Sequence, residues 1–344
     1  MKMISSRCVF SVSVFFKILL LSGLLLGSFN TLAAQVSQEA FIDNMVSQHG
    51  FDRYRLIDLL GKAKVKKSIL KLMYYPPKKK RKRRYRGKPW YKYRRNFVNT
   101  RSINRGIDFW RENTSALERA QRTYGVPAEI IVAIIGVETR YGRIMGNFRV
   151  IDALKTLAFH YPRRADFFRD ELKHYLLFTR EEGVDPLIKK GSYAGAMGLG
   201  QFMPSSYRRY AVDFDGDGER NIWTNTTDAI GSVANYFRSF GWKTGESVIK
   251  ATQVRPNAVE GLLTKKFKPQ YPLWQLKQRG ALYHGDEPND MLGLLVDLRT
   301  EIGTAYWLGF QNYYVITRYN NSKHYAMAVY QLAQEIANGY AESY

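Results

Sequence analysis

Glu138 is the residue whose type and position best suit acid–base chemistry. It ends an apolar run over residues 130–137 that has no polar face, a pattern typical of a buried helix. Glu138 follows Ile134 by four residues and Ile131 by seven, so its side chain shares their helix face. A carboxyl group in such surroundings loses water, which raises its pKa and keeps it protonated near neutral pH. In that form it could act as a general acid.

The same pattern permits a purely structural role for Glu138. Pro127 suits the first turn of the expected helix and Gly142 suits its end. Glu138 then lies close to the helix terminus, where it could pair with Arg140 or Arg143. Helical periodicity alone does not separate this interpretation from the catalytic one.

A glycine-rich segment over residues 191–206 is the second candidate region. Four of its first ten residues are glycine, which lets the backbone approach a ligand or a neighbouring helix closely. Gln201 can both donate and accept hydrogen bonds, and Ser205 or Ser206 could cap a helix beginning near Tyr207. No Gly-Lys-Ser/Thr follows, so a phosphate loop is excluded, and a dinucleotide fingerprint is absent. A glycine-rich turn between helices remains the alternative.

Acidic residues at alternating positions predict a calcium loop. Asp213, Asp215 and Asp217 are followed by Gly218, which matches positions 1, 3, 5 and 6 of an EF-hand loop. Position 12 should carry a bidentate Glu, but Thr224 stands there. An acidic turn without metal is the alternative interpretation.

Other catalytic chemistries have little support. The five histidines show no zinc-binding spacing, and no Gly-x-Ser-x-Gly elbow is present. The only cysteine, Cys8, precedes the apolar part of an expected export signal. Once that signal is removed, we expect no disulfide, thiol nucleophile or cysteinyl metal site.

Residues 1–34 have the pattern of a signal peptide. Lys2 and Arg7 precede a short apolar run over residues 18–26, and Thr31-Leu32-Ala33 gives a cleavage pattern. Ser28 follows Gly27 where a lipoprotein would need cysteine, so lipidation has no acceptor. We expect a soluble periplasmic protein, with an uncleaved signal anchor as the alternative.

Positive charge is concentrated in one segment. The chain has 53 Lys plus Arg against 30 Asp plus Glu, for a net charge of +23. Twelve of these cations lie in the segment from Lys78 to Arg95, and this segment contains no acidic residue. Such a loop could bind nucleic acid, but in an exported protein we expect no nucleic acid and favour an anionic surface of the cell envelope. A solvated insertion without a ligand is the alternative.

The remaining pattern is mainly helical. Helix-period apolar residues occur over residues 38–73 and from 103 to about 252, and another helix carries Ala326 to Ile336. Residues 253–290 lack sustained periodicity, and residues 313–317 are rich in β-formers, which predicts a strand there.

Taken together, these blocks resemble the lytic murein transglycosylase B family, glycoside hydrolase family 103. Glu138-Thr139-Arg140-Tyr141-Gly142 and the block from Ala194 to Ser206 carry the resemblance. Further matches are residues 41–73, 161–164 and 318–328, so nearly all of the chain after residue 34 is covered, apart from the basic loop and residues 253–290.

The resemblance implies a mainly α (α+β) fold with a lysozyme-like catalytic core, and Glu138 as the single general acid/base. Such enzymes cleave the bond between N-acetylmuramic acid and N-acetylglucosamine without adding water, and leave a 1,6-anhydromuramic end. The substrate's own N-acetyl group can then replace the second carboxylate that most glycosidases need.

The resemblance also implies a set of binding residues. By position, the family's groove residues fall on Tyr93, Arg164, Ser192, Gln201, Tyr236, Tyr319, Asn320 and Tyr325. The family's calcium loop closes on an Asp that corresponds to Asp228, and Glu219 would contribute its backbone carbonyl. This loop is one residue longer than in relatives, and the calcium would be structural.

We therefore expect six regions in an enzyme that acts as a monomer on peptidoglycan. They are a signal peptide (1–34), an N-terminal helical region (35–75), a basic loop (76–95), the catalytic core (96–252, with the EF-hand-like loop at 213–228), a peripheral excursion (253–290) and a C-terminal part that completes the groove (291–344). The alternatives are a catalytically silent peptidoglycan-binding scaffold, or a polyanion-binding protein that acts through residues 78–95.

Overall fold

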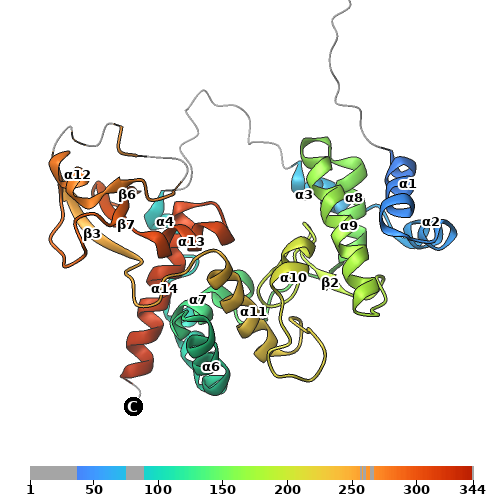
Figure 1. The fold of residues 1–344 in the computed structure, drawn as a ribbon, viewed down its shortest axis with the longest axis horizontal. Helices are drawn as coiled ribbons and strands as arrows, with labels where there is room; N and C mark the ends of the chain where they lie inside the picture. The colour runs from blue at the N-terminus through green and yellow to red at the C-terminus, as the bar shows by residue number, and fades with distance from the viewer. Residues whose placement is uncertain (1–36, 75–88, 256–257, 259–260, 264–266, 343–344) are drawn as a thin grey trace, which may run out of the picture. The chain divides into compact units, whose positions relative to one another are not determined.

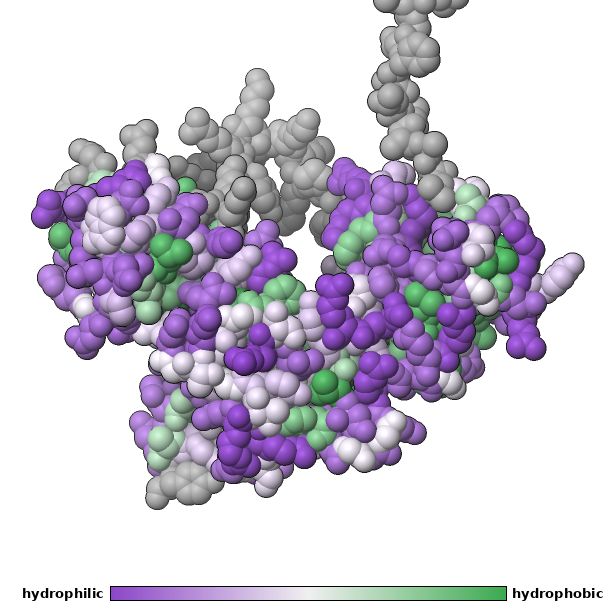
Figure 2. Space-filling view, viewed as in Figure 1, coloured by the Kyte–Doolittle hydropathy of each residue, from purple (hydrophilic) through white to green (hydrophobic). Residues whose placement is uncertain are grey.

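The computed structural model describes residues 37–74, 89–255, 258, 261–263 and 267–342. The expected signal peptide and most of the basic loop lie outside these residues. Among the described residues, no helix is both long and apolar enough to cross a membrane. Hydrophilic side chains cover most of the face seen in Figure 2, and hydrophobic residues form small separate groups on it.

Three short helices begin the described chain (Figure 1): α1 (Gln38–His49), α2 (Arg53–Lys62) and α3 (Lys67–Met73). Ser37 and Asp52 cap the first two by accepting hydrogen bonds from backbone N–H groups in the first turn. Helix α3 packs on α8. This arrangement agrees with the helical pattern predicted for residues 38–73.

The central part of the chain is helical, as predicted. It contains α5 (Thr100–Glu112), α6 (Thr114–Tyr124), α7 (Ala128–Thr139), α8 (Val150–His160), the 3-10 turn η1 (Pro162–Arg164), α9 (Ala165–Glu181), α10 (Pro204–Tyr210) and α11 (Thr226–Ser239). Helix α7 packs against α5, α6, α11 and α14, which explains why it is apolar on all sides. Two short strands, β1 (Phe148–Arg149) and β2 (Lys190–Gly191), form an antiparallel pair beside this core.

Helix α7 ends earlier than the position of Gly142 suggested. Its last residue is Thr139, and both Arg140 and Tyr141 follow in the left-handed region, with φ of 52° and 59°. The turn at Tyr141 brings its ring over Gly136, where a Cβ atom would lie 2.5 Å from the Tyr141 hydroxyl oxygen. Gly136 therefore gives the ring the space to fold back over the helix.

An antiparallel sheet of five strands follows the helical core. The strand order is β4 (Tyr271–Pro272), β6 (Leu292–Arg299), β7 (Thr304–Gly309), β3 (Ile249–Val254) and β5 (Ala281–Leu282). The short helix α12 (Leu273–Gln278) packs against this sheet. Residues 253–290 therefore supply two strands, the end of a third and a helix, although the sequence shows no sustained periodicity there. The strands β4 and β5 are too short to produce a periodic pattern in the sequence.

The strand predicted over residues 313–317 is wrong. These residues lie in α13 (Gln311–Tyr319), which follows β7 directly. Tertiary contacts override their β-propensity, because Tyr313, Val315 and Ile316 are all buried in the core. Asn312 also ties the start of the helix to the backbone of Lys243, accepting from its N–H and donating to its carbonyl.

The last helix, α14 (Lys323–Ala341), confirms the predicted C-terminal helix. It packs against α5 and α7, and Figure 1 shows it in red beside α7. The end of the expected basic loop also forms a helix, α4 (Trp90–Arg94), that packs against α14. Trp90 is only 5% exposed, so this part of the basic segment is anchored in the core and is not a free loop.

Candidate active site

Glu138 and Tyr325 form the centre of the site. Helix α7 carries Glu138 in its last turn, and α14 places the Tyr325 hydroxyl 2.6 Å from Glu138 Oε1, to which it donates a hydrogen bond. Burial raises the pKa of Glu138 to about 7, although the hydrogen bond from Tyr325 acts in the opposite direction. The carboxyl group is therefore protonated at neutral pH far more often than an exposed glutamate.

Glu138 does not form the ion pair with Arg140 or Arg143 that the purely structural interpretation requires. Within the described part of the chain, no Lys, Arg or His lies within ion-pair distance of this carboxylate. Its partner is the neutral hydroxyl of Tyr325. A carboxyl group without a cation partner is free to change its protonation state, as an acid/base must.

Two further tyrosines lie near Glu138. The negative charge of its carboxylate raises the pKa of both Tyr93 and Tyr319, although burial is the larger cause for each. Tyr93 comes from α4, where its ring lies 5.4 Å from the ring of His324. Tyr319 comes from the end of α13 and donates to the Gly200 carbonyl at 2.6 Å. Segments at residues 93, 138, 200, 319 and 325 thus meet at one place.

The ring of Tyr236 contacts the ring of Tyr319 and lies further from Glu138 than Tyr319 does. Its ring is 4.7 Å from that of Tyr319, and its hydroxyl donates to the Arg318 carbonyl at 2.7 Å. Because Tyr236 is only 7% exposed and its hydroxyl is engaged, its position fits a support for Tyr319.

The glycine-rich segment folds back onto the end of α7 through Thr139. The buried Thr139 hydroxyl donates to the Leu199 carbonyl at 2.9 Å and accepts from the Gly142 N–H at 3.0 Å. Gly198 has a φ of 68°, and a Cβ atom there would lie 2.5 Å from the Ile222 carbonyl oxygen. Thr139 was not singled out from the sequence, although it stands beside Glu138 in the quoted motif.

Gln201 and Ser192 both belong to this folded segment. Gln201 has a φ of 52°, and its amide nitrogen donates to the carbonyls of Met145 and Gly198. The Ser192 hydroxyl accepts from the Ala196 N–H at 3.0 Å. The Gln201 amide nitrogen is therefore engaged by the fold, while its carbonyl oxygen has no hydrogen-bond partner among the described residues.

Arg164 and Asn320 are exposed, in contrast to the tyrosines. Arg164 ends η1 and lies over the Phe167 ring, 4.0 Å from its centroid. Asn320 is the residue after α13. The structure brings neither residue into a hydrogen bond with Glu138, and both side chains are accessible to a ligand.

The serine cap expected for the helix near Tyr207 is wrong. Helix α10 begins at Pro204, without a side-chain cap. Ser205 instead bonds the buried carboxylate of Glu171, donating from both its N–H and its hydroxyl at 2.9 and 2.7 Å. This contact ties the segment after the glycine-rich loop to α9.

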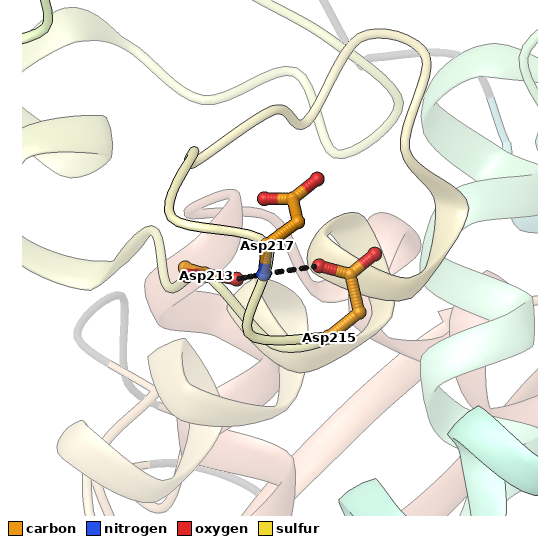
Figure 3. Close-up of side chains that lie close together, drawn as sticks. All are labelled: Asp213, Asp215 and Asp217. Carbon is orange, nitrogen blue, oxygen red and sulfur yellow. Dashed lines mark hydrogen bonds between the residues drawn. The ribbon is translucent and has the colours of Figure 1, made fainter.

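The three aspartates of the acidic loop come together as predicted. Each of Asp213, Asp215 and Asp217 can place a carboxylate oxygen within 4.8 Å of the others, and all three are exposed (Figure 3). Backbone amides of Gly216 and Gly218 donate to Asp213, and such hydrogen bonds lower its pKa. These exposed oxygen ligands could hold a cation such as Ca²⁺.

Asp228 has a different environment from these three. It is fully buried in the first turn of α11, and its two carboxylate oxygens accept from the N–H groups of Phe214 and Asn221, both at 2.7 Å. The Asp228 carboxylate therefore closes the loop by accepting hydrogen bonds from the loop's backbone N–H groups in this structure. Glu219 lies further along the same loop, and its N–H donates to Asp217.

Comparison with known proteins gives the class of this fold and site, a transglycosylase with a lysozyme-like fold. The transglycosylase SLT domain family matches residues 33–334. The chain is 48% identical over 301 residues to the membrane-bound lytic murein transglycosylase B of Escherichia coli (strain K12), covering 87% of this chain and 82% of that protein.

Two solved structures are similar to this chain in both sequence and fold. The soluble lytic transglycosylase SltB1 from Pseudomonas aeruginosa is 49% identical with a TM-score of 0.82, over 88% of this chain and 98% of that one. The Escherichia coli lytic transglycosylase Slt35 in complex with calcium is 47% identical with a TM-score of 0.78, over 88% and 93%. The chain therefore belongs to the lytic murein transglycosylase B family, and it is an enzyme that acts on peptidoglycan.

Proposed function

We propose that Glu138 is the single general acid/base of this transglycosylase. The supporting observation is its partly buried carboxyl group, with a pKa of about 7 and the Tyr325 hydroxyl as hydrogen-bond partner. A group whose pKa lies close to neutral pH can give a proton in one step and take one back in the next.

The reaction needs two proton transfers at the same carboxyl group. Glu138 first protonates the glycosidic oxygen, and the bond from that oxygen to C1 of the muramoyl residue breaks. The Glu138 carboxylate then takes the proton of the muramoyl C6 hydroxyl while that oxygen bonds to C1. The 1,6-anhydro ring results, no water is consumed, and Glu138 ends in its starting form. The N-acetyl carbonyl of the substrate stabilises the cationic C1 between the steps.

A Glu138→Gln variant tests this assignment. Glutamine keeps the shape of the side chain but cannot transfer the proton, so we expect release of anhydro-ended muropeptides from murein sacculi to fall by roughly 10²–10⁴-fold. Binding to sacculi should remain. The products are identified by mass spectrometry.

Glu129→Gln is the matched control for this variant. Glu129 lies at the other end of α7, and burial raises its pKa as well. It should retain full activity. Undiminished anhydro product from Glu138→Gln would refute the assignment, reducing ends from the unaltered enzyme would indicate a hydrolase, and intact sacculi would indicate a binding scaffold.

We further infer that the groove for the glycan is lined by Tyr93, Ser192, Gln201, Tyr319, Asn320 and Tyr325, with Arg164 and Tyr236 at greater distance from the glutamate. Tyrosine rings pack on the faces of sugar rings, and amide groups bond their substituents. The support is positional, because Tyr93, Tyr319 and Tyr325 surround Glu138 and Asn320 is exposed next to Tyr319.

We propose a structural calcium ion for the acidic loop. The exposed carboxylates of Asp213, Asp215 and Asp217 would hold it, with the backbone carbonyl of Glu219 as a further oxygen ligand. Asp228 would support the ion by closing the loop, or would join it after a rearrangement of its own hydrogen bonds. The chemistry at Glu138 does not require this ion.

For the cellular setting, we propose a periplasmic protein freed from a signal peptide at residues 1–34, acting as a monomer. Residues 78–95 would contact anionic groups of the envelope, since this segment carries twelve positive charges. We retain 35–75, 76–95, 96–252, 253–290 and 291–344 as the proposed regions of one peptidoglycan-cleaving enzyme.

A further inference from the structure

A cluster of four arginines lies beside Tyr141. Arg101 and Arg105 come from the first half of α5, and Arg140 and Arg143 from the turn after α7. Arg101, Arg105 and Arg140 line a common cavity of about 200 Å³. Positive charges from two separate segments thus converge on one surface cavity.

No carboxylate neutralises this cluster. Among the described residues, none of the four arginines takes part in an ion pair, although many other arginines of the chain do. The cavity lining contains no Asp or Glu either. Burial lowers the pKa of Arg105, and the charges of Arg143, Arg101 and Arg140 lower it further. Four like charges held together without a partner are unfavourable unless an anion binds among them.

The neutral groups of the cavity are already engaged in the fold. Asn99 caps α5 by accepting from the Ser102 N–H, and the Tyr141 hydroxyl donates to the Ser102 carbonyl at 2.9 Å. The 13-residue helix α5 therefore begins at this cavity, with the positive end of its dipole facing it. The guanidinium groups are the donors that remain for a ligand.

The cluster has no part in the chemistry at Glu138. The pKa of that carboxyl group is set by burial and by Tyr325, with no contribution from these arginines, and Glu138 is not among the residues that line the cavity. An explanation for four unpaired arginines must therefore be sought outside the catalytic step.

We propose that this cavity binds a phosphate group. Each guanidinium offers a fork of parallel N–H donors, and phosphate has enough acceptor oxygens to engage several forks at once, whereas a carboxylate has two. The cavity of about 200 Å³ has room for such a group. The phosphate could belong to a free phosphate or phosphate ester, or to a lipid headgroup.

The test measures phosphate binding by the purified protein in calorimetry, against chloride at the same ionic strength. We expect saturable binding of inorganic phosphate by the unaltered protein. Arg105→Gln and Arg140→Gln should each weaken it at least tenfold, and Arg105→Lys should restore it only in part because lysine lacks the fork. Thermal melting verifies that each variant is folded.

Arg111→Gln is the matched control, because it removes the same charge from the last turn of the same helix. It should bind phosphate like the unaltered protein, since Arg111 lies outside the cavity. Equal phosphate affinity in Arg105→Gln, Arg140→Gln and Arg111→Gln would overturn the proposal. So would the absence of binding beyond the effect of ionic strength.

Vesicles then identify the source of the phosphate. If Arg105→Gln weakens binding to phosphatidylglycerol vesicles relative to Arg111→Gln, with no binding to phosphatidylcholine, the ligand is a lipid headgroup. If both variants bind the vesicles equally while only Arg105→Gln loses inorganic phosphate, the ligand is soluble. Both outcomes support a phosphate site, and the comparison between variants removes the contribution of residues 78–88.

Discussion

At the scale of single residues, the protonation of Glu138 results from two opposing effects. Burial among apolar residues of α7 favours the neutral acid, and the hydrogen bond from Tyr325 favours the carboxylate. Together they hold the pKa near 7. Because the acid must be protonated to start the reaction, activity should fall as the pH rises through this value.

Tyr325→Phe should move that fall to higher pH. The Tyr325 hydroxyl stabilises the carboxylate, so its removal raises the pKa of Glu138 further. A hydrogen bond to a charged group contributes roughly 1.5–3 kcal/mol, which corresponds to about one to two pKa units. The measurement is the pH profile of kcat/KM on soluble glycan strands.

Tyr236→Phe is the control for this profile. It removes a tyrosine hydroxyl that donates to the Arg318 carbonyl and not to Glu138. The pH at which activity falls should therefore stay where it is in the unaltered enzyme. An unchanged profile in Tyr325→Phe would show that Tyr325 does not act on the titration of Glu138.

At the scale of elements, the site depends on the hydrogen bonds that hold the glycine-rich segment against the end of α7. Thr139 makes this connection, because its hydroxyl bonds both Leu199 and Gly142. The left-handed residues after Thr139 turn the chain away from the helix directly after Glu138 and Thr139. The helix thus sets the position of the acid, and the loop forms the surface beside it.

Thr139→Val should weaken both stability and activity. Valine has the same shape, but it leaves the buried Leu199 carbonyl and the Gly142 N–H without this partner, at a cost of roughly 1–3 kcal/mol. Chemical denaturation measures the loss, and kcat on sacculi should fall because the loop carries Gln201. Thr317→Val, at a buried threonine that bonds only within α13, should cost less and leave activity unchanged. Equal effects of the two variants would argue against a special role for Thr139.

At the scale of the whole molecule, the site is completed by segments from distant parts of the chain. Helix α4 brings Tyr93, α7 brings Glu138, and α13 and α14 bring Tyr319 and Tyr325. The acidic loop lies between α10 and α11, and α11 packs on α6 and α7. An ion in this loop would therefore stabilise the core at a point outside the reaction.

Calcium should raise the thermal unfolding midpoint of the protein, and a chelator should lower it. Asp217→Asn should abolish this response by removing one of three clustered carboxylates. Without calcium the variant should be at least as stable as the unaltered protein, because the repulsion within the cluster is smaller. Asp58→Asn, an exposed aspartate on α2, should keep the full response. An unaltered protein with the same midpoint in calcium and in chelator would exclude the structural ion.

The sequence by itself determined the helical class, the position of the buried helix α7, the place of Glu138 at the end of that helix and the grouping of the three aspartates of the loop. These features depend on local periodicity and on residues close together in the chain, which sequence patterns record. They needed no knowledge of distant contacts.

Only the tertiary structure decided which groups meet at Glu138. No local pattern places Tyr325 beside Glu138, because it lies 187 residues further along the chain. The same holds for the hydrogen bonds that join Thr139 to the glycine-rich segment and for the cluster of four arginines beside Tyr141. The helix over residues 311–319 and the strands within residues 253–290 were missed for the same reason. Burial against partners far away in the chain overrides local propensity, and two-residue strands are too short to show a period.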